Sequence, residues 1–501
     1  MSRDDLVSYP PLSTAKECSM GIAVRARRGA ALALGLVVAL LATSARPASA
    51  QFISVNNPVV SQRADTAVYK HTAGYYYMTA SVPDYKRVEL RRSTTLQGLG
   101  SAATQNAFVA PSSGALSGWI WAPDIQYYDG AWYMYFSASP STAVFNQRLY
   151  WIRNTCANPM SCSWSAPQRF TTGWESFQLD AASFVNRGVR YFVWAQDSPS
   201  TNYNSHMYIA RMNGATGITG TAVEIARPTY SWEMEGVAGV VEGPSPLVRN
   251  GRVYIAYSAS ATDSRYKLGL LSAPDTADLL NPASWTKRPN PVFQTANGVY
   301  GPGHGSFTVA EDNATDMLVY HARDYANPTP DALTDPNRHT RMQQLYWQDN
   351  GDPFFGQPVP SGVTNPGIRG QFSNRCVDNY NRDTTLGALV RLYDCNGGTA
   401  QQWEFTYRAA GSYYEIRNRN TGTCLDDLNS STAANADVGL WTCNGGTAQR
   451  WTFQDRGNGW FSLRNVAGSM CLDNYEWNAA NGARLSLYPC NGLGAQLWRR
   501  G

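Results

Sequence analysis

The sequence lacks several features that would assign it to a common class of protein. No two cysteines occur in a C-x-x-C spacing, so neither a zinc site nor a dithiol redox motif is expected. The net charge is only +4, and no Lys/Arg run stands out beyond the extreme N-terminus, so we expect neither a nucleic-acid partner nor a membrane partner. Helical 3.6-residue periodicity is weak throughout, which favours an all-β chain.

Long apolar runs are also missing, apart from one near the N-terminus. Residues 30–41 form this run, which is too short for a comfortable membrane span. Three arginines lie before it within residues 25–28, and A-S-A at 48–50 reads as a cleavage motif. We therefore expect residues 1–50 to be a signal peptide of a secreted protein whose mature chain starts at Gln51. An N-terminal anchor helix is the alternative.

Aromatic residues, in contrast, are abundant, with 29 Tyr and 16 Trp. A turn followed by an aromatic strand begins at Gly74, Gly130, Gly188 and Gly251, and a weaker fifth copy begins at Asp316. The period of about 60 residues is typical of a four-stranded propeller blade. The sequence therefore predicts five blades closed around one axis.

A polar residue precedes each aromatic strand at nearly the same offset, on what we expect to be the first strand of its blade. These residues are Asp65, Asp124, Asp180, Glu242 and His304. If the units are blades, four carboxylates and one imidazole meet in a central funnel. Glycosidic cleavage needs one carboxylic acid to protonate the leaving oxygen and one carboxylate to activate water or attack carbon. The alternative is that some of these acids bind backbone amides or a structural cation.

The last part of the chain, from about Gly370, repeats three times and closes each unit with Q-x-W. Each unit also has two cysteines 19 residues apart. The equal spacing predicts three local disulfides, and the remaining two cysteines would form a fourth: Cys376–Cys395, Cys424–Cys443, Cys471–Cys490 and Cys156–Cys162. A unit this small cannot bury a core alone, so we expect three to close on a pseudo-three-fold axis.

Each of these units places an acid, an aromatic ring and an amide at matching positions. They are Asp378, Tyr393 and Asn396; Asp426, Trp441 and Asn444; and Asp473, Tyr488 and Asn491. An acid and an amide can bind sugar hydroxyls while a ring covers the apolar face of the sugar. We predict a shallow sugar site in each unit and assign the Trp of Q-x-W to the core.

Two family resemblances follow from these motifs. The tail, roughly 368–498, resembles the ricin-type β-trefoil of carbohydrate-binding module family 13. Residues 57–362 resemble glycoside hydrolase family 43, in its exo-α-L-arabinofuranosidase branch. The ordered stretches that carry this second resemblance include A-D-T-A-V-Y, I-W-A-P-D-I, F-Q-L-D-A, V-E-G-P, V-Y-G-P-G-H-G-S-F and D-P-N-R-H-T-R. We predict a propeller domain over 51–362 and a trefoil domain over 363–501.

The family 43 resemblance implies an inverting mechanism with three carboxylates. Asp65 matches the general base, Glu242 the general acid, and Asp180 the acid that orients the proton donor and tunes its pKa. His304 matches the family histidine beneath the active site, which is often linked through water to a bound cation, here a Ca or Na ion. The chemistry itself would require no cofactor.

Three further residues are expected to bind substrate. Arg323 matches an arginine near the sugar, and Trp121 and Asp124 belong to the I-W-A-P-D-I stretch. We expect a secreted, monomeric exo-α-L-arabinofuranosidase that acts on arabinan, arabinoxylan or other arabinose-decorated plant cell-wall polysaccharide. A β-xylosidase or galactan hydrolase of the same family is the alternative among enzymes. A non-catalytic two-domain lectin is the alternative from another class, although a pure binder has no need for the acid pair of Asp65 and Glu242.

Overall fold

The structure is a computed structural model. It describes residues 55–500 except 199–204, 312, 314, 349, 364–366, 397, 409–412 and 457–459. The expected signal peptide, residues 1–50, lies outside the described residues. Within the described part, every regular element is a β-strand or a short 3-10 turn, as the all-β prediction requires. None of the described segments forms a helix with the length and apolar character needed to cross a bilayer.

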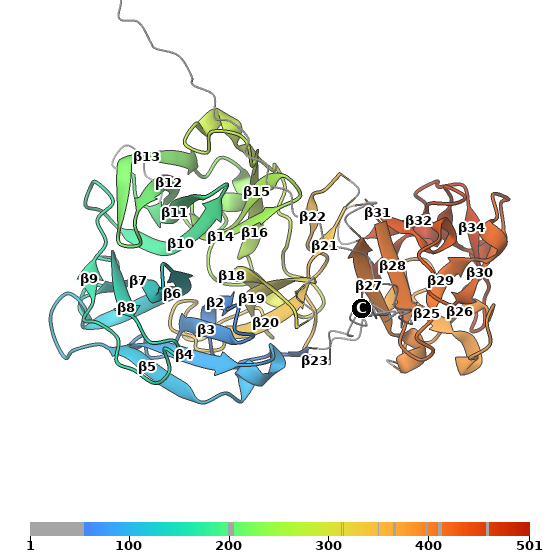
Figure 1. Ribbon diagram of the computed structural model, residues 1–501, viewed down its shortest axis with the longest axis horizontal. Coiled ribbons are helices and arrows are strands. Elements are labelled where there is room, and N and C mark those ends of the chain that lie inside the picture. Colours follow the sequence, from blue (N-terminus) through green and yellow to red (C-terminus); the bar gives the residue numbers. More distant parts are fainter. Residues whose placement is uncertain are drawn as a thin grey trace, which may run out of the picture. The chain divides into compact units, whose positions relative to one another are not determined.

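Five antiparallel sheets surround a common centre in the blue-to-yellow part of Figure 1. The strands of the first two blades are β2 (Ala64–Lys70), β3 (Tyr76–Ser81), β4 (Arg87–Ser93), β5 (Thr104–Val109), β6 (Gly118–Tyr128), β7 (Ala131–Ser139), β8 (Arg148–Asn154) and β9 (Gln168–Arg169). Those of the next two are β10 (Gln178–Asn186), β11 (Val189–Gln196), β12 (His206–Asn213), β13 (Gly217–Ala226), β14 (Val241–Arg249), β15 (Arg252–Ala259), β16 (Lys267–Pro274) and β17 (Thr286–Lys287). The fifth blade has β18 (Tyr300–Val309), β19 (Asp316–Arg323) and β20 (His339–Gln344).

The five-blade prediction is confirmed. The first strands of the blades contact one another in a closed ring, in the order β2, β6, β10, β14, β18 and back to β2. The aromatic strands are the second strands, and β3, β7 and β19 are buried along their whole length. This burial follows from the packing of each blade between two neighbours, which covers both faces of a central strand. Three short turns complete this region: η1 (Gln97–Gly100), η2 (Ser231–Glu233) and η3 (Pro282–Ser284).

The fifth blade is completed by the N-terminal segment. Val60 forms an isolated antiparallel bridge with Thr340 of β20. The side chain of Asn57 donates to the carbonyl of Met342 and accepts from its N–H, both at 2.9 Å. Next to it, β1 (Asn56–Asn57) pairs with β23 (Gly362–Val363). The start of the propeller is thus hydrogen-bonded to its last blade, which closes the ring.

The tail contains twelve strands joined in one sheet, four in each repeat. They are β24 (Ile368–Gly370), β25 (Cys376–Asn379), β26 (Val390–Tyr393), β27 (Trp403–Arg408), β28 (Tyr413–Asn418), β29 (Cys424–Asp427), β30 (Ala436–Trp441), β31 (Trp451–Asp455), β32 (Phe461–Asn465), β33 (Cys471–Asn474), β34 (Leu485–Tyr488) and β35 (Trp498–Arg500). Short turns follow the second and third strands of each repeat: η4 (Tyr380–Arg382), η5 (Thr399–Gln401), η7 (Leu428–Ser430), η8 (Thr447–Gln449), η9 (Tyr475–Trp477) and η10 (Gly494–Gln496). A separate hairpin, β21 (Tyr346–Trp347) and β22 (Pro353–Phe354), precedes the tail in sequence.

All four predicted disulfides are present, three of them across 19 residues within one repeat each. The Trp residues of Q-x-W are fully buried, as expected for a core position. Each indole N–H donates to the carbonyl of the residue after the first cysteine of its repeat, at 2.8, 3.0 and 3.0 Å. The indoles therefore fix the three repeats to one shared core without an unpaired donor.

One buried position breaks the three-fold symmetry of the tail. The last residue of β25 is Asn379 and that of β33 is Asn474, but the last residue of β29 is Asp427. All three side chains are buried. Burial raises the pKa of Asp427 to about 6, although the N–H of Ser431 donates to its carboxylate at 3.1 Å. Folding therefore leaves an acid where its two sister positions hold a neutral amide.

We predict that Asp427→Asn stabilises the protein at pH 8 but not at pH 4. Because the folded pKa lies above the unfolded value of 3.8, the wild type binds its proton more tightly when folded and loses stability as the pH rises from about 4 to 6. The gain should be on the order of 1 kcal/mol above pH 6. Denaturant melts at both pH values measure it. The matched variant Asn474→Asp should lose stability at pH 8 only, and an equal gain from Asp427→Asn at both pH values would refute the explanation.

Candidate active site

A bulge interrupts the first strand of every blade at the same place. In each case the pairing with the second strand shifts register. The residue that follows the last pair before this shift takes a positive φ. These residues are Asp65 (52°), Ala122 (44°), Asp180 (55°), Gly243 (57°) and His304 (27°). A left-handed residue in a strand is strained unless it is glycine, and such strain is common at functional sites.

The bulge frees one backbone N–H, and in four blades a neighbouring blade supplies a side-chain acceptor for it. The N–H of Asp65 donates to Nδ1 of His321 at 3.1 Å, and that of Gly243 donates to the carboxylate of Asp180 at 3.0 Å. The N–H groups of Ala122 and His304 donate to serine hydroxyls at 2.8 Å. Each acceptor belongs to the preceding blade, so the same contacts join the blades and fix the bulge residues.

A cavity of about 650 Å³ is lined by residues of the five first strands and by loops between the strands of the blades. Five of the residues expected at the active site line it: Asp65, Trp121, Asp180, Glu242 and His304. The sequence placed Asp65, Asp180 and Glu242 at equivalent positions, but the bulges show a difference. Glu242 lies one residue before the bulge residue of its blade, which is Gly243. A Cβ at Gly243 would approach the ring of His304 to 2.9 Å, so this position has no room for a side chain.

Asp65 is surrounded by cationic and imidazole groups. The guanidinium of Arg338 donates to Asp65 Oδ1 at 3.1 Å, and the Nδ1 atoms of His321 and His304 lie 3.3 and 3.4 Å from the same oxygen. Burial raises the pKa of Asp65, but its polar surroundings, chiefly the guanidinium of Arg338, more than offset that effect and hold it well below its usual value. Asp65 is therefore an ionised carboxylate at neutral pH, as a general base requires.

Glu242 has the opposite environment. Burial, together with the negative charge of Asp180, raises the pKa of Glu242 to about 8. The hydroxyl of Tyr266 donates to Glu242 Oε1 at 2.8 Å and partly opposes the rise. Burial and the charge of Asp65 also raise the pKa of Asp180. A protonated Glu242 and an ionised Asp65 thus line the same cavity, and an acid and a base in these states can hydrolyse a glycosidic bond.

His321 supports Asp65 from behind. Its Nδ1 accepts the N–H of Asp65, so its proton is on Nε2 and the ring is neutral. Burial lowers the pKa of His321 to about 4, in agreement with a neutral ring. The ring of Tyr266 stacks on His321 at 5.6 Å between centroids. Tyr266 therefore connects the backbone support of Asp65 to the carboxyl group of Glu242.

Neither Asp124 nor Arg323 lines the cavity of about 650 Å³, which we call the sugar cavity after its predicted substrate. Asp124 lines a second cavity of about 260 Å³ along the five first strands, and burial raises its pKa to about 7. The guanidinium of Arg323 donates to the carbonyls of Thr262 and Ala332, both at 2.7 Å. Thr262 and Leu333, beside these carbonyls, line the sugar cavity, so Arg323 supports its wall from outside. Arg338 is the arginine that reaches the carboxylates.

The sequence interpretation missed Arg338, Tyr266 and His321. Arg338 stands in D-P-N-R-H-T-R, the same stretch that carried the family resemblance, so a signal for it was present. His321 stands on the fifth aromatic strand, in the segment V-Y-H-A, as a histidine among apolar residues. Tyr266 lies in a segment without a recognisable motif. Its role depends on the approach of β16 to β18 and could not be read from spacing.

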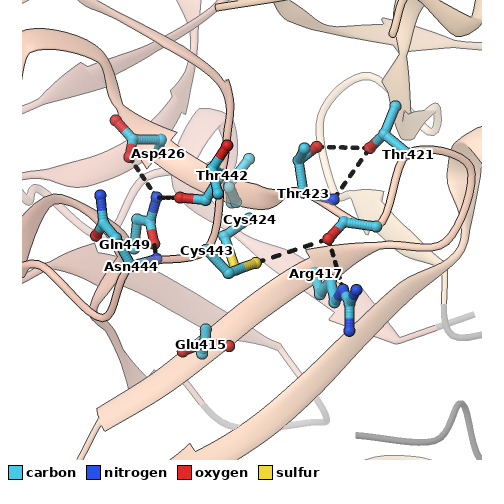
Figure 2. Close-up of a disulfide and its surroundings, with 12 residues drawn as sticks. Glu415, Arg417, Thr421, Thr423, Cys424, Asp426, Thr442, Cys443, Asn444 and Gln449 are labelled. Atoms are coloured by element: carbon cyan, nitrogen blue, oxygen red, sulfur yellow. Dashed lines mark hydrogen bonds between the residues drawn. A yellow bond between two sulfur atoms is a disulfide. The ribbon is translucent and has the colours of Figure 1, made fainter. Parts of the chain in front are cut away.

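The Gln of Q-x-W positions residues of the tail that the sequence predicts to bind sugar. In the second repeat, Nε2 of Gln449 donates to Asp426 Oδ2 at 2.9 Å, and Gln449 Oε1 accepts the N–H of Asn444 at 2.8 Å (Figure 2). The third repeat has the same two bonds through Gln496. The aromatic residues lie on the adjacent strand, opposite the first cysteine, and remain exposed by 38, 42 and 40 % in Tyr393, Trp441 and Tyr488.

The disulfide of this second repeat also bears on metal binding. Glu415, Cys424 and Cys443 form the sole cluster of three metal-type ligands found among the described residues. Both sulfurs are consumed by the disulfide shown in Figure 2, so the cluster is not a metal site. Among the described residues His304 belongs to no such cluster of three, although Asp65 and Asp180 lie 3.4 and 3.6 Å from its Nδ1. A cation there would depend on water for most of its ligands.

Comparison with known families agrees with this geometry. The family "Glycosyl hydrolases family 43" matches residues 55–353, and "Ricin-type beta-trefoil lectin domain-like" matches residues 360–441 and 399–488. The chain belongs to glycosyl hydrolase family 43. The match spans all five blades of the propeller and includes every residue that lines the sugar cavity. The chain is therefore a glycoside hydrolase with a trefoil attached to its C-terminal side in sequence.

Individual relatives of this family 43 hydrolase match about two thirds of the chain. An extracellular exo-α-(1→5)-L-arabinofuranosidase of Streptomyces avermitilis is 48% identical over 337 residues, which cover 67% of this chain and 69% of the relative. An α-L-arabinofuranosidase of Humicola insolens is 45% identical over 344 residues, 68% of this chain and 69% of the relative. The crystal structure of an α-L-arabinofuranosidase from Lactobacillus brevis is 45% identical, covers 62% of this chain and 98% of its own, and superposes with a TM-score of 0.59.

The pKa of Glu242 predicts the alkaline limit of activity. A general acid must be protonated, so kcat/KM on a glycoside with an alkyl leaving group should fall as the pH rises through about 8. Asp180→Asn removes a negative charge and should move this limb to lower pH. Tyr266→Phe removes a donor to the carboxylate and should move it to higher pH. Asp124→Asn, outside the sugar cavity, is the control that leaves the limb in place, and shifts of the same sign in both test variants would contradict the assignment.

Proposed function

We propose that this hydrolase is a secreted exo-α-L-arabinofuranosidase that acts with inversion of configuration. The observation that supports it is a single cavity in which Asp65 is ionised beside Arg338 while Glu242 is protonated. These are the protonation states that an inverting glycosidase needs in its base and its acid. The choice of arabinose rests on the relatives from Streptomyces avermitilis and Humicola insolens, which are named as arabinofuranosidases.

In the proposed reaction, Asp65 takes a proton from the water that attacks the anomeric carbon. Glu242 gives its proton to the departing glycosidic oxygen, and Asp180 keeps the pKa of Glu242 high. Asp65 belongs to the first blade and Glu242 to the fourth, which are not adjacent in a ring of five. Acids on opposite sides of a pit leave room for a water molecule, as in inverting enzymes, whose carboxyl groups stand about 6.5–9.5 Å apart.

Aromatic rings at the cavity can contact two consecutive sugars. Trp121 lines the cavity wall and is buried, whereas Phe145 lines it with 69 % of its surface exposed. Phe145 makes an edge contact with Phe177 at 6.2 Å between ring centroids. We propose that the terminal arabinose lies against Trp121 and that the next sugar contacts Phe145. An exposed phenyl ring next to the cavity offers an apolar face to that sugar.

The other parts of the proposal concern the surroundings of the catalytic domain. The relatives from Streptomyces are named as extracellular, which supports secretion of this chain with residues 1–50 as its leader. The trefoil would hold the enzyme on arabinan or arabinoxylan and so raise its local concentration at the substrate. We propose a monomer. The hydrolysis would need no cofactor. A hydrated Ca or Na ion beside His304 would have a structural role in the cavity of about 260 Å³ along the first strands, which His304 also lines.

The proposed substrate and stereochemistry predict one product pattern. Incubation with debranched arabinan and arabinoxylan should release arabinose alone, and galactan should release nothing. Proton NMR should show the β anomer first from an α-linked substrate, because inversion delivers water to the face opposite the leaving group. Release of xylose or galactose would instead favour the β-xylosidase or galactan hydrolase alternatives. An α anomer formed first would overturn the inverting mechanism while leaving the glycosidase assignment intact.

The roles of the two acids predict different responses to the leaving group. Glu242→Ala should lose about 10²- to 10⁴-fold in kcat/KM on arabinan oligosaccharides but much less on aryl arabinosides, whose phenolate leaves without protonation. Asp65→Ala should lose activity on both, because the attacking water keeps its proton. Azide should restore part of the activity of Asp65→Ala on aryl arabinosides. Asp278→Ala is the control, because Asp278 is an exposed acid in the loop between β16 and β17. Equal losses of Glu242→Ala on both substrates would show that Glu242 is not the acid.

A further inference from the structure

The three repeats of the trefoil differ at one corner beside the sugar site. Each corner has three members. The first is the last residue of η4, η7 or η9, and the second is the residue before η5, η8 or η10. The third lies two residues after the first strand of the next repeat, which for the third repeat is the first strand of the tail, β24. The corners consist of Arg382, Gly398 and Asn420; of Ser430, Gly446 and Ala467; and of Trp477, Leu493 and Phe372. The first is polar and the second is small. We call the third, formed by Phe372, Trp477 and Leu493, the aromatic corner.

Contacts show that these positions are equivalent in space as well as in sequence. In the first repeat, the side chain of Asn420 donates to the carbonyl of Arg382 at 3.4 Å, and Thr399 donates to Asn420 at 3.3 Å. In the third repeat, the rings of Phe372 and Trp477 meet edge to face at 5.0 Å between centroids. The aromatic corner therefore replaces a hydrogen-bonded polar corner with packed apolar side chains.

A change in the neighbouring loop makes room for the aromatic corner. The first residue of the turn before Q-x-W is Thr399 in the first repeat and Thr447 in the second, but it is Gly494 in the third. A Cβ at Gly494 would lie 3.1 Å from Gln371 Oε1 and in van der Waals contact with the ring of Trp477 and with Phe372 Cβ, at 3.6 and 3.7 Å. A threonine adds a methyl and a hydroxyl to this already filled space. The glycine and the two aromatic residues thus form one coordinated difference from the sister repeats.

The aromatic corner is exposed and adjoins the sugar site of its own repeat. Phe372, Trp477 and Leu493 are 44, 46 and 54 % exposed. The N–H of Leu493 donates to the side-chain oxygen of Asn491 at 2.9 Å, and Trp477 follows Asp473 by four residues. Three large apolar side chains exposed together are unusual on a protein surface and mark a binding site more often than scattered single residues do.

We propose that the aromatic corner is a second sugar subsite, so that the third repeat binds at least two consecutive residues of a polysaccharide chain. The first sugar lies at Asp473, Tyr488 and Asn491, and the next stacks its C–H face on Trp477. The first and second repeats lack this platform and bind a single sugar each. This proposal rests on the proposed role of the trefoil in polysaccharide binding, and it assigns that role mainly to the third repeat.

A sugar chain is favoured over a protein partner because the corner is continuous with a site of sugar-binding chemistry. The platform is formed by one indole edge-packed on a phenyl ring, and a ring face with a polar indole edge suits the C–H face and hydroxyl rim of a sugar. A second copy of this chain seated on the corner is the competing occupant, and the experiment includes a measurement that identifies it.

The test compares ligands of increasing length on the full chain carrying Glu242→Ala, which prevents hydrolysis. Calorimetry is performed with arabinose, arabinotriose and debranched arabinan. In this background, Trp477→Ala should weaken arabinotriose and arabinan binding by about tenfold while leaving arabinose binding unchanged. Asp473→Ala should abolish binding of all three ligands to the third repeat. Arg382→Ala, at the matching corner of the first repeat, should leave the binding of arabinotriose and of arabinan unchanged.

A graft provides a test that does not depend on loss of function. Ser430→Trp combined with Thr447→Gly and Ala467→Phe should give the second repeat the same preference for arabinotriose over arabinose. An unchanged ratio of arabinotriose to arabinose affinity in Trp477→Ala would overturn the subsite. So would sedimentation showing that Trp477→Ala turns a dimer into a monomer, because the corner would then be a self-association surface. If debranched arabinan binds no repeat, the proposed role of the trefoil in arabinan binding fails as well.

Discussion

The hydrogen bond from a bulge residue to the preceding blade is the contact on which the active site depends. In four of the five blades the bulge turns one backbone N–H out of its own sheet, and a side chain of the neighbouring blade accepts it. A buried N–H without a partner would cost about 1–3 kcal/mol. The same bond that avoids this cost also fixes the orientation of Asp65 and of His304. Blade packing and catalytic geometry are therefore determined by the same few contacts.

Two acids in one cavity acquire different protonation states because their neighbours differ. Burial acts on both Asp65 and Glu242 in the same direction. Only Asp65 has a guanidinium within hydrogen-bonding distance, from Arg338, and Glu242 has a tyrosine hydroxyl instead. A charged donor outweighs the cost of burial and a neutral donor does not. The choice of donor thus decides which carboxyl group serves as base and which as acid.

Repeats made much of this molecule predictable from sequence. The five aromatic strands and the equal cysteine spacings recur because each blade or trefoil unit must solve the same packing problem. Positions that break the repeat could not be predicted in that way. Asp65 and Asp180 are themselves the bulge residues of their blades. Glu242 instead lies one residue before its bulge residue, Gly243, and Asp124 lies two residues after its bulge residue, Ala122. Arg323 and Arg338 lie close in sequence, and only the fold shows that Arg338 reaches the carboxylates whereas Arg323 binds backbone carbonyls.

The pairing of Asn57 and Val60 with β20 has a consequence for how the chain reaches its native state. Asn57 and Val60 are synthesised long before the blade that they complete, so the ring cannot close until the whole propeller has left the ribosome. Contacts between such distant parts of a chain form slowly and leave sheet edges exposed in the meantime. A circular permutant that joined the two ends of the ring and opened a loop between other blades would turn the closing contact into a local one.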